Sequence, residues 1–138
     1  MLTFTPKNVG ATLRYFDLPG RGVPLLFLHG MGCASSSDYP RVAAAPQLQQ
    51  RRRILIDLLG SGYSDRPTRF PYTVQAHATS VSGLIRHLGL PAVHPYGHSM
   101  SGAVAIVVAH RLSRRVRQGE CPPTATRSSR WMRVCALT

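Results

Sequence analysis

The apolar residues fall into three short runs separated by a segment with helical spacing. The runs Val23–Leu28, Ile54–Leu58 and Ala92–Tyr96 have the length of strands and little polar alternation, which is typical of strands buried on both faces of a parallel sheet. Between the second and third runs, Thr73–Leu88 repeats its apolar residues close to every third or fourth position, as an amphipathic helix does. This order predicts an α/β fold with a mainly parallel sheet and flanking helices.

Weaker patterns predict the remaining elements. The segment Thr12–Asp17 alternates like a strand, and the turn residues of Leu18–Gly22 follow it, so we expect a hairpin at the sheet edge. Residues Tyr39–Gln50 predict a modest helix that Pro46 interrupts. The charge run Arg51–Arg53 is predicted to be the solvated entrance of a strand rather than a binding site.

The third apolar run ends in the sequence GHSMSG. The run that follows it, Ala103–Ala109, is apolar on every side, which predicts a helix buried against the centre of the sheet. Ser99 has small residues two before and two after it, Gly97 and Ser101, which is the spacing of the G-x-S-x-G nucleophile elbow with its last glycine replaced. On a strand-to-helix turn, the helix amides and dipole would face a developing oxyanion, which suits acyl transfer. The hexapeptide alone leaves open whether Ser99 is a nucleophile or part of an ordinary serine-rich helix cap.

Two further motifs precede the elbow in the chain. The first strand ends at HGMG, residues 29–32, and the second leads into DLLGSGYSDRP, residues 57–67. These motifs followed by GHSMSG resemble the α/β-hydrolase family over about residues 13–112. The resemblance implies the amino-terminal part of an α/β-hydrolase fold, without the later strands of that fold.

The resemblance also implies a function and a site. It implies serine-type hydrolysis of a small ester, amide or related acyl substrate, with no cofactor and no metal; hydrolysis of a C–C bond stays open as well. Ser99 would be the nucleophile, and the backbone N–H groups of Met31 and Met100 would form the oxyanion hole. The other motif residues would support the elbow and its neighbouring loop: His29, Gly30, Gly97, His98 and Ser101.

The general base and its acid are harder to place. Asp57 and Asp65 precede Ser99, whereas the family order is serine, acid, histidine, so both are expected to be structural. None of the six histidines is a convincing base, and the residues after Arg111 contain no histidine and a single acid, Glu120. We therefore expect this chain to lack catalytic competence by itself.

The composition of residues 113–138 differs from that of residues 1–112, the predicted partial hydrolase domain. Of the net charge of +12, half is contributed by residues 111–138, where arginine is mixed with proline, serine and cysteine. We expect a basic tail that is disordered or translated out of frame. The alternatives are a natural truncation, or a non-catalytic interaction or basic nucleic-acid-binding protein built on half a hydrolase fold, although nucleic-acid binding is not our expectation.

Composition and the predicted sheet set the remaining expectations. With 138 residues and 43% hydrophobic residues, the chain can form one globular core. It has no membrane-length apolar run and no signal-peptide pattern, so we expect no membrane partner and a cytoplasmic location. Its three cysteines show no metal or disulfide pattern. Without a further strand beside Ala92–Tyr96, an exposed sheet edge would favour self-association.

Overall fold

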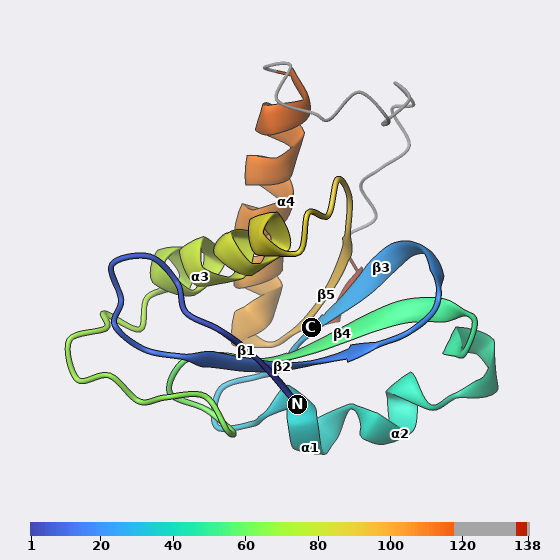
Figure 1. Ribbon diagram of the computed structural model, residues 1–138, viewed down its shortest axis with the longest axis horizontal. Coiled ribbons are helices and arrows are strands. Elements are labelled where there is room, and N and C mark those ends of the chain that lie inside the picture. The colour runs from blue at the N-terminus through green and yellow to red at the C-terminus, as the bar shows by residue number, and fades with distance from the viewer. Residues whose placement is uncertain (118–134, 138) are drawn as a thin grey trace.

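A computed structural model of the protein describes residues 1–117 and 135–137, which form a six-stranded sheet with helices on both faces (Figure 1). The strands are β1 (Leu2–Phe4), β2 (Leu13–Leu18), β3 (Arg21–Leu28), β4 (Arg51–Asp57), β5 (His94–His98) and β6 (Cys135–Leu137). The helices are α1 (Ser35–Asp38), α2 (Pro40–Ala43), the short 3-10 helix η1 (Pro46–Leu48), α3 (Val74–His87) and α4 (Met100–Arg117). The predicted α/β class is therefore confirmed.

The strand order is β1-β2-β4-β3-β5-β6. β3 lies between β4 and β5 and runs parallel to both, with Leu28 opposite Ile56 on one side and Gly97 on the other. β1, β2 and β4 pair antiparallel in turn. Because parallel strands end at the same edge of a sheet, this register brings the loops after β3, β4 and β5 together.

The hairpin predicted at the sheet edge is wrong. The chain does turn sharply between β2 and β3, but β4 lies between these two strands and pairs with both. At the turn, a Cβ on Gly20 would lie 2.1 Å from the backbone carbon of Arg51. Because the backbones of Gly20 and Arg51 can approach this closely, β4 begins directly beside the turn and pairs with β2 on one side and with β3 on the other.

The helices cover the sheet unequally. The predicted helix over residues 73–88 is α3, which Thr73 caps by accepting a hydrogen bond from the Ala76 N–H at 3.2 Å. Figure 1 shows α3 and α4 on one face and α1 and α2 on the other. The predicted helix over residues 39–50 is instead the pair α2 and η1, and η1 begins at Pro46.

Apolar side chains fill both faces of the sheet. Under α3 and α4, the main core contains Leu26 and Leu28 of β3 and Ile54 of β4. Under α1 and α2, a smaller cluster centres on Phe27 and Leu55, so alternate residues of β3 and β4 serve opposite layers. The continuous apolar runs of the sequence predict this arrangement, in which both faces of the sheet are buried.

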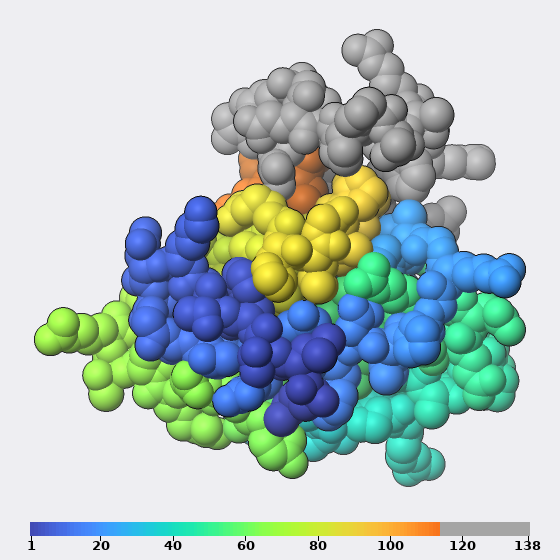
Figure 2. All heavy atoms as spheres, viewed as in Figure 1, coloured from blue at the N-terminus to red at the C-terminus, as the bar shows by residue number. Residues whose placement is uncertain are grey.

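The first strand also packs against the end of α3. The ring of Phe4 lies over the ring of His87, with centroids 5.1 Å apart. Figure 2 shows the blue atoms of the amino-terminal residues against the yellow atoms that follow α3. The contact fixes β1 on the antiparallel side of the sheet, away from the loop that precedes α4.

Helix α4 departs from the sequence prediction in its burial. Its apolar run suggests a helix buried all round, yet Ala103, Ile106 and His110 lie exposed along one stripe, and Ile106 keeps 54% of its surface accessible. The opposite side, with Val104 and Val108, is buried in the main core. Among the described residues, α4 is therefore buried on one side only.

The arginine run before the second apolar strand also departs from its prediction. Arg53 is buried, and its guanidinium donates to the carbonyls of Ala43 at 2.7 Å and Pro19 at 2.8 Å. Arg52 forms two hydrogen bonds to the Asp17 carboxylate, at 2.9 and 2.7 Å, and both side chains are partly buried. These side chains hold β4 to its neighbours, because their acceptors lie on the elements around it.

The segment set apart as a tail contributes to two elements. Residues 113–117 continue α4, and residues 135–137 form β6, which runs parallel to β5 with Gly97 opposite Ala136. The carboxyl end of β5 is therefore paired, and the open edge predicted there is wrong for these residues. The remainder of the predicted tail, residues 118–134 and 138, lies outside the described residues. In the described part of the chain, no helix combines the length and the apolar character needed to cross a bilayer.

Candidate active site

Ser99 occupies the sharp turn between β5 and α4. Its φ of 53° lies in the left-handed region, which a residue with a side chain adopts only where the surrounding structure imposes it. The first helical hydrogen bond runs from the Gly102 N–H to the Ser99 carbonyl at 2.9 Å. Ser99 is exposed, so its side chain leaves the turn toward solvent at the carboxyl edge of the sheet.

Gly97 allows the helix to begin this close to the strand. A Cβ at this position would lie 2.1 Å from the backbone oxygen of Ser101 and 2.8 Å from the nitrogen of Gly102. No side chain fits there, since both contacts are backbone atoms that cannot move aside. The requirement for a small residue two before Ser99 is thus a requirement for glycine.

Ser101, two residues after Ser99, satisfies the spacing in another way. Its side chain is fully buried, and its hydroxyl donates a hydrogen bond of 2.5 Å to the backbone carbonyl of His29. The hydroxyl points away from the turn and into the loop after β3. The sequence placed a small residue here but gave no indication of this bond, which joins positions 72 residues apart.

The loop after β3 lies against the turn of Ser99. A Cβ on Gly30 would come within 2.8 Å of the His98 ring and 3.5 Å of the Ser99 Cβ. The Cys33 N–H donates to the Gly30 carbonyl at 3.2 Å, closing a turn in which Gly32 has a φ of 74°. The motif residues His29, Gly30, Gly97, His98, Ser99 and Ser101 are therefore brought together, as the sequence predicts.

His29 is the buried centre of this loop. Its Nε2 accepts a hydrogen bond from the Leu58 N–H at 3.0 Å, so the ring proton resides on Nδ1. Nδ1 in turn donates to the Gly30 carbonyl at 2.7 Å. In the planar peptide that follows, the Met31 N–H points opposite to that carbonyl, so His29 orients it.

Comparison with known proteins agrees with this geometry. Residues 23–119 match the model of the alpha/beta hydrolase fold family. The chain belongs to this family. The match includes the loop after β3, the loop after β4 and the elbow, which are the three motifs that carry the resemblance in the sequence.

Several relatives of this α/β-hydrolase family member are hydrolases by name. It is 34% identical over 99 residues to a 2-hydroxymuconate semialdehyde hydrolase of Pseudomonas putida, an alignment that covers 72% of this chain and 35% of the relative. Lipase 1 of Psychrobacter immobilis is also 34% identical, over 70% of this chain and 30% of the lipase. The chain thus spans about a third of the length of these curated relatives.

A solved structure shows the same relationship. The meta-cleavage product hydrolase CumD superposes with a TM-score of 0.71 at 27% sequence identity, over 83% of this chain and 41% of the hydrolase. The shared part is the portion of the fold that contains the elbow. Both comparisons therefore identify this chain with one part of a larger fold.

Two acids, Asp57 and Asp65, stabilise the loop after β4. Asp57 is buried, and its carboxylate accepts hydrogen bonds from the N–H and hydroxyl of Ser36, at 2.9 and 2.7 Å, and from the Tyr63 N–H at 3.0 Å. The Asp65 carboxylate accepts from the Thr12 N–H at 2.7 Å. Both carboxylates accept hydrogen bonds from groups of loops and of α1 rather than from a histidine, in agreement with the structural role expected from their place in the chain.

In the described ranges, no imidazole forms a hydrogen bond to the Ser99 hydroxyl. His29 uses both of its nitrogens in the loop, and His98 packs over Gly30. His77 lies on α3, where it is buried against Phe70. Burial lowers the pKa of His77, and the proximity of a second imidazole, that of His29, lowers it further.

Two other groups were candidates for chemistry. Residues 1–117 and 135–137 contain no cluster of three or more His, Cys, Asp or Glu side chains that could hold a metal ion. Cys33 is partly exposed beside the loop after β3, but its hydrogen bond to Asp38 raises the pKa of the thiol. A raised pKa disfavours the thiolate, so Cys33 is a poor nucleophile.

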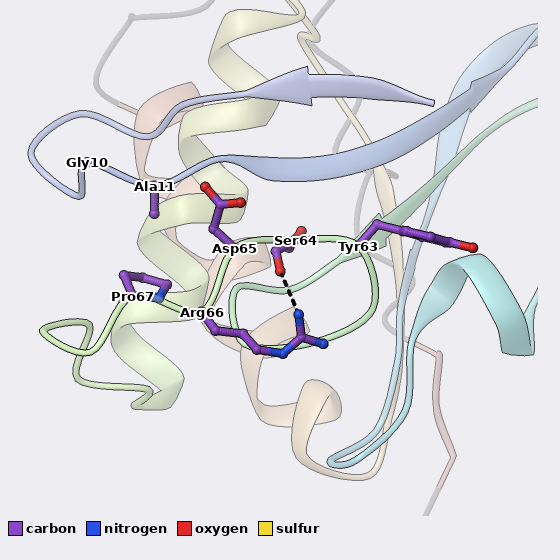
Figure 3. A pocket seen from close by; sticks show the side chains of 7 residues that line it. All are labelled: Gly10, Ala11, Tyr63, Ser64, Asp65, Arg66 and Pro67. Atoms are coloured by element: carbon purple, nitrogen blue, oxygen red, sulfur yellow. Dashed lines mark hydrogen bonds between the residues drawn. The ribbon is translucent and has the colours of Figure 1, made fainter.

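A cavity of about 420 Å³ lies beside the loop after β4 (Figure 3). It is lined by Gly10, Ala11, Tyr63, Ser64, Asp65, Arg66 and Pro67. Arg66 donates within its own loop, to the carbonyls of Ser64 at 3.4 Å and Gly62 at 3.0 Å, so its charged group is partly engaged. None of the lining residues belongs to the elbow or to the loop after β3.

Proposed function

We propose that Ser99 is the nucleophile of a serine-type hydrolase that acts on a small ester, amide or related acyl substrate. The observation that carries this proposal is the positive φ of Ser99 at the junction of β5 and α4, beside Gly30. A strained turn of this kind presents a hydroxyl to solvent with the first helix amides next to it. Membership of the α/β-hydrolase family supports the same reaction class.

The oxyanion hole follows from two backbone groups. Met100 begins α4, and the first amides of a helix have no intrahelical acceptor. The Met31 N–H is oriented by the hydrogen bonds to the Gly30 carbonyl from His29 and Cys33. We assign these two N–H groups to the oxygen that gains charge when Ser99 attacks an acyl carbon.

The reaction also needs a base that takes the proton of Ser99 and an acid that orients the base. In residues 1–117 and 135–137 no histidine is hydrogen-bonded to Ser99, and Asp57 is committed to the loop after β4. The proposal therefore places both groups outside the described residues. On this proposal, the described residues alone bind and orient an acyl group but hydrolyse it slowly.

The substrate is proposed only as a class. The relatives named above are by name a 2-hydroxymuconate semialdehyde hydrolase, a lipase and a meta-cleavage product hydrolase, so their names cover more than one class of substrate. The residues that surround Ser99 here are mainly backbone and loop-supporting groups. These residues support acyl chemistry in general and favour none of these substrate classes over the others.

A second candidate is a non-catalytic interaction protein, which the exposed Ala103 and Ile106 on one side of α4 favour. The nucleic-acid alternative has less support. Arg51, Arg52 and Arg53 bond to Val23, Asp17, Ala43 and Pro19, so these arginines are not free to bind phosphates.

The test of the proposed function is labelling of the full chain with a fluorophosphonate probe. We expect slow labelling that disappears in Ser99→Ala, with Ser37→Ala as a control because the exposed Ser37 hydroxyl is bonded within α1. Labelling that persists in Ser99→Ala would overturn the assignment of the nucleophile. Rapid labelling that depends on Ser99 would show that a residue of this chain acts as its base.

A further inference from the structure

We propose that Ser101 is a positioning residue that holds the loop after β3 in the geometry needed for the oxyanion hole. This inference rests on the proposed function of Ser99 and adds a residue to it. The G-x-S-x-G spacing has glycine at this position, which has no hydroxyl to donate. The bond from Ser101 to the His29 carbonyl is therefore a feature that an elbow with glycine at this position cannot form.

The loop needs such a contact because of its composition. Gly30 and Gly32 flank Met31, and glycine permits backbone rotations that other residues do not. Met31 itself is 76% exposed, so its side chain contributes little packing that could hold the backbone. The orientation of the Met31 N–H then depends on the hydrogen bonds of the neighbouring peptide groups.

Two consecutive peptide groups before the Met31 N–H are held by side chains. The first joins His29 to Gly30, and the Ser101 hydroxyl binds its carbonyl. The second joins Gly30 to Met31, and His29 Nδ1 binds its carbonyl. Each peptide group is planar, so fixing the carbonyls of His29 and Gly30 also fixes the direction of the Met31 N–H relative to the start of α4.

The position of Ser101 in the fold makes this link specific. Ser101 is the second residue of α4 and is fully buried, so its hydroxyl ties the helix that follows Ser99 directly to the end of β3. The two proposed oxyanion donors, Met31 and Met100, belong to the two segments that it joins. Ser101 thereby fixes the separation of the donors without contacting the substrate.

The experiment compares Ser101→Ala with a matched variant, Ser35→Ala, in the full chain. The Ser35 hydroxyl is also fully buried and also donates to a backbone carbonyl, that of Phe27 in β3, at 3.1 Å. Each variant removes one buried hydroxyl bond to a backbone carbonyl, but only Ser101→Ala removes it in the loop after β3, beside Gly30. Ser101→Gly, which restores the glycine of the spacing, serves as a second variant if alanine prevents folding.

The first measurement is nuclear magnetic resonance of the backbone. In Ser101→Ala we expect the His29 carbonyl carbon to move upfield and the Gly30 and Met31 amide signals to shift, with none of these changes in Ser35→Ala. Unchanged signals in Ser101→Ala and Ser101→Gly would overturn the proposal. This measurement needs no reaction of Ser99, so it decides the role of Ser101 even if Ser99 proves not to be the nucleophile.

The second measurement is the rate of fluorophosphonate labelling of Ser99. Loss of a whole oxyanion donor reduces rates about 10²–10³-fold, so a displaced donor should reduce labelling roughly tenfold. Ser35→Ala should label at the unaltered rate. Shifted Met31 signals with unchanged labelling would overturn the connection to the oxyanion hole, whereas labelling independent of Ser99 would contradict the proposed function instead.

Discussion

A Cβ on Gly97 would lie 2.1 Å from the backbone oxygen of Ser101, well inside the contact distance of two atoms. At Gly97, β5 therefore lies so close to the start of α4 that no side chain fits at this position. Since β5 also pairs with β3 through Gly97, a displacement there would affect the central sheet as well as the turn.

Replacing Gly97 with alanine should therefore destabilise the fold. We expect a loss of at least about 3 kcal/mol in the free energy of unfolding, at the upper end of the cost of overpacking a buried site. The measurement is urea denaturation followed by circular dichroism. Gly22→Ala is the control, because Gly22 has a φ of 72° but open space around it, and strain alone should cost about 1–2 kcal/mol. Equal losses in the two variants would contradict the contact argument.

Asp57 should behave as a structural residue. Asp57→Asn replaces one acceptor oxygen by an NH₂ group that faces the donors of Ser36 or Tyr63, so a hydrogen bond to a buried charged group is lost. We expect a destabilisation of about 2–3 kcal/mol, typical of such a bond, in thermal or urea unfolding. In Asp38→Asn, the exposed control, the loss should be small. A fully stable Asp57→Asn variant would argue that this carboxylate serves chemistry instead.

These contacts show what the sequence can and cannot predict. The parallel strands and the turn at Ser99 are predictable, because continuous apolar runs and small residues around a serine are local signals. The place of β4 between β2 and β3 is not, since it depends on the close approach of Gly20 to Arg51, far apart in the chain. The bond from Ser101 to His29 has the same long-range character, which leaves no periodicity in the sequence.

His77 predicts how stability depends on pH. Because burial lowers its pKa, the folded protein keeps this imidazole neutral at pH values where the unfolded chain, with a pKa of about 6.5, already binds a proton. The unfolded state binds more protons there, so stability should be full above about pH 6.5 and fall as the pH decreases below it. Urea denaturation at a series of pH values measures this slope.

The control for His77 is a histidine on the surface. His77→Leu should flatten the pH dependence below pH 6.5, whereas His110→Gln, on the exposed side of α4, should leave it as it is. An unchanged slope in His77→Leu would assign the pH dependence to other groups.

Self-association stays a prediction, and the structure suggests where to test it. The carboxyl end of β5 is paired with β6, but Ala103 and Ile106 are exposed on one side of α4, and apolar surface left exposed favours association. We expect the full chain to elute as an oligomer in size-exclusion chromatography with light scattering, and Ile106→Glu to shift it toward monomer. Val42→Glu is the control, because Val42 is a similarly exposed apolar residue on α2. A monomeric wild-type chain would contradict the prediction.

The missing base gives the last prediction. If Ser99 lacks only a base, imidazole in solution should act as one, because the serine is exposed and imidazole can approach its hydroxyl. We compare the rate of para-nitrophenyl acetate hydrolysis in the presence of both the chain and imidazole with the sum of the two rates measured separately. The first rate should be higher, by about tenfold or less, because a base in solution lacks the advantage of fixed proximity. Ser99→Ala should remove this excess, and Ser37→Ala should retain it.

An excess that survives Ser99→Ala would mean that imidazole acts on the ester independently of the elbow. No excess in the wild-type chain would show that a base alone does not make this serine a nucleophile, in which case the interaction protein becomes the better description of the molecule.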